Sequence, residues 1–276
     1  MGGAALAALT AAFTYFATQP IFPLWAQDLG ASVVFVGIII ATGLLAQTIL
    51  RPIMGSLSDG YGRKIFIVTA LFGYGVFQIF YALCRNPYEL LLARTLHAIC
   101  IASLWPALFA SIGDVGGKGK EIGLALFAMD IGMLGGGVFC AALVEKVGRQ
   151  SLFWYAGIVG IGLAIAVSVL MPETHKGKGR SLGEATKELL KIPSLWSKEK
   201  ELAVSSLFIA LLALGQSALT AYYPLLGAFM GMSDAQIALV AVCARLMALL
   251  LRVPSGLLAD KVGEEKVFTV GIASLA

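Results

Sequence analysis

Long uncharged stretches separated by short charged segments dominate the pattern of this chain. The uncharged stretches cover 1–27, 29–50, 65–84, 95–113, 150–172 and 202–233, and two more, 122–144 and 235–251, carry one charge each. Each reaches or approaches the roughly 20 residues that a helix needs to cross about 30 Å of hydrocarbon. We therefore predict an all-α membrane protein with eight complete helices, 4–26, 33–54, 65–84, 88–111, 122–144, 151–171, 203–227 and 235–253, and the start of a ninth at 267–276.

Composition supports this assignment and excludes other classes of protein. Hydrophobic residues make up 59% of the 276 residues and charged residues 13%, against about 25% in soluble domains. A soluble fold of this length could not cover so much apolar surface, and a disordered chain would be far more polar. The net charge of +4 comes from loop residues, so nucleic acid is not a predicted partner. Four cysteines and two histidines show no metal-ligand spacing, so no cofactor is predicted.

Basic residues in the connecting segments predict the orientation of the chain. Fifteen lie on one side of the predicted membrane, whereas only Arg85, Lys146 and Arg149 lie on the other. The positive-inside rule places the first side, and the N-terminus, in the cytoplasm of a multi-pass protein of the cell (plasma or inner) membrane. The long connection 172–202 is then a cytoplasmic central loop. Its capping-box spacing at 181–184 predicts a short amphipathic helix on the membrane surface.

An internal repeat relates the two ends of the chain at an offset of 201 residues. Eleven of the 40 positions from 23 to 62 are identical to their counterparts, where chance gives roughly three or four. Both copies contain the pattern R-x-x-x-G-x-L-x-D-x-x-G on the cytoplasmic side. Because six helices separate the copies, the repeats have the same orientation. Parallel repeats of this kind are typical of transporters with two six-helix halves.

These motifs carry a resemblance to a known family. Segment 55–64 reads GSLSDGYGRK and closely resembles the signature loop between helices 2 and 3 of the major facilitator superfamily. The copy at 256–263, GLLADKVG, resembles that family's second loop, and PET at 172–174 is also similar to the family. Gly60 departs from the pattern, since the family usually has Arg there.

The resemblance implies a particular division of the chain. It predicts a complete first half at 1–171, the central loop at 172–202, and an incomplete C-terminal half at 203–276 with helices 7 and 8 and the start of 9. By the repeat offset, roughly a hundred residues of a full transporter would be missing from the C-terminus.

The signature loop suggests an ionic latch. Asp59 and Arg63 are four residues apart, and Asp114 at the end of helix 4 could pair with the same guanidinium. In the family, such a carboxylate–Arg–carboxylate relay latches the halves together when the pore is closed to the cytoplasm. The alternative is a set of solvated loop charges. The predicted loop and latch residues are Gly55, Asp59, Gly62, Arg63, Lys64, Asp114, Gly256, Asp260 and Gly263.

Three charged residues fall inside predicted spans, where charge is costly and indicates function by default. Asp130 is the one carboxylate placed well inside a span, so we predict that it carries protons, with a static ion pair to Arg94 as the alternative. Arg94 resembles the cavity arginine of helix 4 in the family, which is implicated in proton transfer. Arg245 is the third charge. His97, one turn after Arg94, is either a cavity residue or a packing histidine.

Helix 5 adds a glycine-rich segment after Asp130. Gly132, Met133, Gly136 and Gly137 resemble the G-P-x-x-G-G signature of drug exporters and antiporters in the family, with Met in place of Pro. The same glycines also fit a small-xxx-small face that packs against another helix. Polar residues on helices 1 and 7 are the predicted substrate contacts in the cavity: Tyr15, Gln19, Gln216, Tyr222 and Tyr223.

Together these features predict a secondary active transporter that works by alternating access. Proton-coupled efflux of a small organic or amphiphilic compound is the first interpretation, and uptake or exchange of an organic anion or sugar is the second. A membrane-embedded enzyme would need paired catalytic groups, and a channel would not need repeated loops. The expected partners are a small-molecule substrate, protons and membrane lipids, and the expected state is monomeric.

Overall fold

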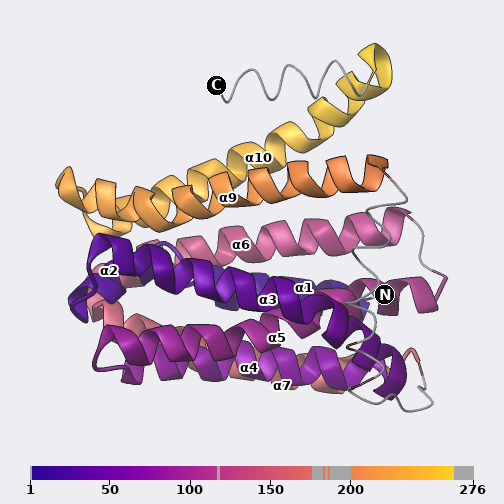
Figure 1. Cartoon of the computed structure of the whole chain (residues 1–276), viewed down its shortest axis with the longest axis horizontal. Coiled ribbons are helices and arrows are strands. Elements are labelled where there is room, and N and C mark those ends of the chain that lie inside the picture. Colours follow the sequence, from indigo (N-terminus) through magenta and orange to yellow (C-terminus); the bar gives the residue numbers. More distant parts are fainter. Residues whose placement is uncertain (1, 117–118, 176–182, 184–185, 187–199, 264–276) are drawn as a thin grey trace.

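The structure, a computed structural model, describes residues 2–116, 119–175, 183, 186 and 200–263. The helices run back and forth along one direction (Figure 1). They are α1 Gly2–Phe16, α2 Phe22–Asp28, α3 Val33–Tyr61, α4 Arg63–Leu83, α5 Pro87–Asp114, α6 Gly119–Val147, α7 Arg149–Leu170, α9 Lys200–Phe229 and α10 Asp234–Val262. We call α1 to α7 the first half, and α9 with α10 the second half.

The prediction of a helical membrane protein is confirmed. Seven of these helices are long and apolar enough to cross a membrane: α3, α4, α5, α6, α7, α9 and α10. Most extend beyond their predicted ends; α3, expected to stop at 54, continues to Tyr61. The inner part of the predicted central loop and the stub at 267–276 lie outside the described residues.

The first predicted span, 4–26, is wrong as a single helix. The chain leaves helical geometry at 17–21 between α1 and α2. Pro20 and Pro23 cannot donate to the carbonyls of Phe16 and Gln19, so the helical hydrogen-bond ladder is interrupted twice. Buried Gln78 stabilises the break from α4, because its amide nitrogen donates to the carbonyl of Thr14 at 2.9 Å.

The backbone carries the internal repeat at equivalent positions. Gly30 and Gly231 have φ values of +94° and +80°, and Gly62 and Gly263 have +106° and +94°. Left-handed turns of this kind favour glycine, which explains why both repeats retain it there. The helices that follow also begin alike, since Ser32 and Ser233 each accept a hydrogen bond from a backbone N–H three residues later.

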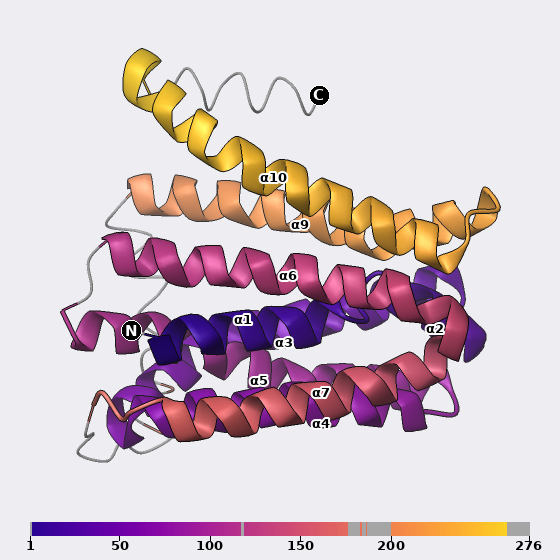
Figure 2. The same cartoon turned by 180° about the vertical axis from the view of Figure 1, so that it is seen from behind.

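The bundle has two ends that differ in their residues. The loop-motif end contains Gly62, Asp114 and the start of α1, and the Arg149 end contains the 28–32, 84–86 and 230–233 turns. The second half packs on the first through contacts of α10 with α6, and of α9 with α3 and α2. In both views α10 lies close to the bundle at the Arg149 end and rises away from it toward its own C-terminus (Figures 1 and 2).

Glycines allow several helices of the first half to pack at backbone distance. A Cβ on Gly157 of α7 would lie 2.8 Å from the carbonyl oxygen of Gly75 on α4. A Cβ on Gly136 of α6 would lie 2.5 Å from the carbonyl oxygen of Phe13 on α1, and one on Gly132 would clash with that of Leu9. The predicted span 122–144, called helix 5 in the sequence analysis, is α6 in the structure. Its small-xxx-small face of Gly132 and Gly136 packs against α1.

Candidate functional site

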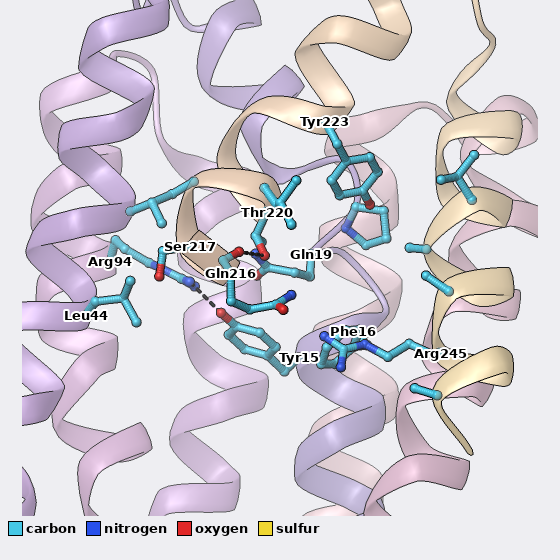
Figure 3. Close-up of a pocket in the computed structure, with 17 residues that line it drawn as sticks. Tyr15, Phe16, Gln19, Leu44, Arg94, Gln216, Ser217, Thr220, Tyr223 and Arg245 are labelled. Carbon is cyan, nitrogen blue, oxygen red and sulfur yellow. Dashed lines mark hydrogen bonds between the residues drawn. The ribbon is translucent and has the colours of Figure 1, made fainter. Parts of the chain in front are cut away.

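A cavity of about 500 Å³ lies between the two halves. The broken first span contributes one wall through residues just before and inside the break, and α9 and α10 contribute the opposite wall (Figure 3). Among its lining residues are Tyr15, Phe16, Gln19, Pro20, Ile40, Leu44, Arg94, Gln216, Ser217, Thr220, Tyr223 and Arg245. The cavity is thus apolar and aromatic, with a few convergent polar groups, as small-molecule sites usually are.

Arg94 of α5 is held against aromatic rings at the first-half wall. Its side chain is buried and donates to the Tyr15 hydroxyl at 2.7 Å. The guanidinium carbon lies 5.2 Å from the Tyr15 ring centroid and 4.9 Å from that of Phe22. Gly43 of α3 makes room for it, since a Cβ there would approach the Arg94 Cγ to 3.1 Å. Cation–π contacts of this kind stabilise a buried guanidinium without neutralising its charge.

Arg245 of α10 provides a second cation from the other half. Its guanidinium carbon lies 4.9 Å from the ring centroid of Phe16. Figure 3 shows Arg94 and Arg245 approaching the cavity from opposite sides, with Tyr15 and Gln216 between them. The lining residues include these two cations and no carboxylate. A ligand with an acidic group would therefore meet positive charge from both walls.

Several predicted cavity residues line the cavity, and Tyr222 does not. Tyr15, Gln19, Gln216 and Arg245 all contribute to the wall. The Tyr222 hydroxyl instead sits against Gly37 of α3, at a point where a Cβ would clash with it. The reason is helical geometry: neighbouring residues point about 100° apart, so Tyr223 shares the face of Gln216 and Thr220, while Tyr222 is turned away.

His97 and Asp130 also lie outside the cavity lining. His97 is fully buried, its Nδ1 lies 2.7 Å from the Tyr81 hydroxyl, and its ring stacks on Phe77 at 5.1 Å. These contacts favour the packing alternative over a place in the cavity. Asp130 is half-buried on α6 and has an interaction partner within the chain. The helix that carries it, α6, contacts both α1 and α10.

The signature loop forms an ionic cluster at the loop-motif end. Arg63, whose side chain is nearly buried, pairs with Asp59 and lies 3.1 Å from Asp114 through its Nε. It also donates to the Ser58 hydroxyl at 2.9 Å. The structure therefore places the three predicted relay residues in contact, all within the first half. Gly256 and Asp260 fall in the last turns of α10, and their contacts lie outside what the structure describes.

Sequence reasoning missed the role of Glu173 beside this cluster. Its Oε1 accepts from the backbone N–H of Arg63 at 2.9 Å, and its Oε2 from that of Lys64 at 3.1 Å. A carboxylate at these positions caps the N-terminus of α4 and favours its dipole. The Glu173 Oε2 also lies only 2.8 Å from the position that a Cβ of residue 62 would occupy, so a side chain there would clash with it. This close approach is a second reason why residue 62 is glycine. The sequence signal that could have indicated this cap is the PET segment at 172–174, whose glutamate comes shortly after the end of α7.

A second ionic cluster at the Arg149 end was also missed. The Arg149 guanidinium donates to both oxygens of Asp28, at 2.8 and 2.9 Å, and to both oxygens of Asp234, at 2.7 and 2.8 Å. Asp28 ends α2 in the first half, whereas Asp234 begins α10 in the second. Pairs between loops more than 80 residues apart leave no local spacing signal, which is why the sequence did not reveal them.

Comparison with known proteins identifies the family of this chain. Residues 4–276 match the family model of the Major Facilitator Superfamily. The chain is 28% identical over 254 residues to an uncharacterized MFS-type transporter of Methanocaldococcus jannaschii, covering 88% of this chain and 64% of that protein. It is 27% identical over 210 residues to the quinolone resistance protein NorA of Staphylococcus aureus, covering 75% of this chain and 53% of that protein.

The chain thus spans about half to two thirds of the length of these curated relatives. Its repeat, its signature loop and its apolar helices agree with the family match over nearly all of its residues. The chain belongs to the Major Facilitator Superfamily and is a multi-pass integral membrane protein.

Proposed function

We propose that this chain exports a small amphiphilic organic compound in exchange for protons, by alternating access of the cavity between its halves. The observation that carries the proposal is the cavity itself, in which aromatic rings and hydrogen-bonding groups from both halves surround one space. Similarity to a quinolone resistance protein supports a drug-like substrate. Exposed apolar side chains along the outer helix faces, such as Val34 and Val169, would contact lipid in a monomer.

The proposal includes the orientation and the division of the chain. The excess of basic residues favours a cytoplasmic loop-motif end, with the N-terminus on the same side of the plasma or inner membrane. Substrate would then enter the cavity from the loop-motif end and leave at the Arg149 end. The halves 1–171 and 203–276 would move relative to each other about the cavity, joined by 172–202.

Protons would act through Asp130 on α6. A carboxyl group there favours one packing of α6 against α1 and α10 when charged and another when neutral, because a membrane interior penalises charge strongly. The glycine face of α6 keeps these helices close enough for a small change to reach both halves. Coupling therefore needs no contact between the proton site and the substrate.

A second candidate is exchange of an organic anion, which one specific observation favours. Arg94 and Arg245 face the cavity from opposite halves, and the lining residues include no carboxylate to balance them. A carboxylate or similar group on the substrate would supply the missing counter-charge. The two candidates differ in substrate and not in the site, so one experiment separates them.

Substrate protection of a cavity cysteine provides that experiment. Ser217 lines the cavity, whereas Leu214, one turn earlier on α9, is 67% exposed and does not. In a background whose four native cysteines are alanine, a quinolone should slow thiol labelling of Ser217→Cys and leave Leu214→Cys unchanged. A simple aromatic carboxylate that protects equally well would favour the anion exchanger. Equal labelling with and without either compound would contradict the site.

The latch gives a further expected result. We expect Asp59→Asn to reduce transport on the order of tenfold while protein abundance stays normal, because it weakens the hold on Arg63 without opening a core cavity. Asp59→Glu, which keeps the carboxylate, is the matched control and should retain most of the activity. Transport rates normalised to the amount of protein in the membrane test this. Wild-type rates in Asp59→Asn would refute a latch.

A further inference from the structure

Arg149 connects the two halves through a forked ion pair. Its Nε and one terminal nitrogen bind Asp234, and its other terminal nitrogen binds Asp28, so one planar guanidinium serves two carboxylates. The side chains of Arg149 and Asp234 are 26% and 19% exposed, so water screens the pair less than it does a surface ion pair. Bidentate contacts of arginine with carboxylates combine strength with a fixed geometry.

The position of Arg149 indicates that it serves this contact and not its own helix. It begins the 22-residue helix α7, where a positive charge opposes the helix dipole. No carboxylate of α7 lies in that first turn to offset the effect. Asp234, in contrast, begins α10 and favours its dipole while it reaches across to the other half. The placement of Arg149 and Asp234 therefore indicates that their ion pair links the two halves.

The buried apolar packing differs between the two ends of the bundle. At the Arg149 end, one buried apolar cluster contains residues of both halves, including Leu24, Val36 and Phe153 with Leu225 and Ile237. The described buried cluster toward the loop-motif end, around Leu71, Leu104 and Leu108, contains residues of the first half alone. The α10 helix also rises away from the bundle in that direction (Figures 1 and 2).

The two ionic clusters follow the same division. At the loop-motif end, the described partners of the Arg63 side chain all belong to the first half. At the Arg149 end, the fork joins α2 and α7 to α10, and the carboxylate of Glu145 on α6 also accepts from the Ala235 N–H at 3.4 Å. Both contacts reach the first turn of α10. These polar contacts and the shared apolar cluster join the two halves at the Arg149 end, so they must separate before the cavity can open there.

We propose that Arg149 is a positioning residue for transport, whose fork to Asp28 and Asp234 holds the Arg149 end of the cavity shut. This inference rests on the proposed alternating access. Opening toward this end requires the Arg149–Asp234 contact to break, while the Arg149–Asp28 contact within the first half remains. Released Arg149 keeps Asp28 as its counter-charge, so the broken state leaves no isolated cation and the fork can re-form in each cycle.

Labelling of a cavity cysteine from the Arg149 side tests the proposal without requiring transport. Gln19→Cys in a background lacking the native cysteines places a buried thiol in the cavity wall. In intact cells, a membrane-impermeant thiol reagent should reach it on the order of tenfold faster when Arg149→Gln is added. Lys146→Gln removes a neighbouring positive charge on the same side and should leave the rate unchanged.

The two aspartates distinguish a gate from local stabilisation. Asp234→Asn should match Arg149→Gln, and combining the two should add little, since both remove the same link. Asp28→Asn should raise the labelling rate much less, because its bond stays within one half. Arg149→Lys should give an intermediate rate, since it keeps the charge and loses the fork.

Three results would overturn the gate: an unchanged labelling rate in Arg149→Gln, an equal increase in Lys146→Gln, or an Asp28→Asn effect as large as that of Asp234→Asn. Because these rates do not depend on a substrate or a proton gradient, they can fail or hold independently of the proposed efflux.

Discussion

Replacing Asp130 by Asn should abolish gradient-driven transport while sparing expression and substrate binding. Asn has nearly the same volume and mimics the protonated carboxyl group. We therefore expect α6 to keep the packing that it has when Asp130 is neutral. The proton can then no longer shift the balance between openings of the cavity. Substrate binding should survive because Asp130 does not line the cavity.

Transport and binding must be measured on the same preparation to test this. Asp130→Glu is the matched control, since it keeps a titratable carboxyl group and should retain pH-dependent transport at a reduced rate. Binding of a quinolone to purified protein should differ little among the three forms. If Asp130→Asn transports with the pH dependence of the wild type, its carboxylate is structural and the coupling assignment is wrong.

Replacing Gly136 by Ala should destabilise the protein by about 1–3 kcal/mol, the usual cost of forcing extra volume into a packed interface. The new Cβ would lie 2.5 Å from the Phe13 carbonyl oxygen and 2.8 Å from the Ala17 nitrogen, both backbone atoms beside the break in the first span. Backbone atoms cannot rotate away as a side chain can. The α1–α6 contact would have to open along its length.

The neighbouring glycine provides the control for this substitution. A Cβ on Gly135 meets the Phe13 ring at 3.4 Å, close to an ordinary contact. Gly135→Ala should therefore be neutral or slightly stabilising, because alanine favours helix by up to about 1 kcal/mol. Thermal unfolding of both variants in detergent, followed by loss of monodisperse protein, gives the comparison. Equal stability would show that α1 and α6 do not pack as described.

Much of the fold could be predicted because the membrane makes local sequence decisive. A span must satisfy its backbone internally, so long apolar runs form helices, and every run after the first did so with its ends a few residues beyond most of the predicted bounds. The repeat was equally readable, since positive-φ turns at Gly30, Gly62, Gly231 and Gly263 restrict those positions to glycine. These are properties of short segments.

Features that depend on three-dimensional packing were harder to predict. Pro20 and Pro23 interrupt the first span, but proline is tolerated in many membrane helices, so its effect depended on Gln78 and the neighbouring helices. Tyr222 and Tyr223 are equally polar, and only the rotation of α9 decides which one faces the cavity. Glu173 and the Arg149 fork join segments that are distant in the chain, where no spacing rule applies.

Quinolone uptake into inverted membrane vesicles is the most direct test of the central claim. With the loop-motif end facing the medium, an interior more acidic by about one pH unit should drive about tenfold accumulation if one proton is exchanged per substrate. An uncoupler should release the compound, and vesicles without the protein should not accumulate it. Accumulation that ignores the pH gradient, or that requires an alkaline interior, would contradict proton-coupled export.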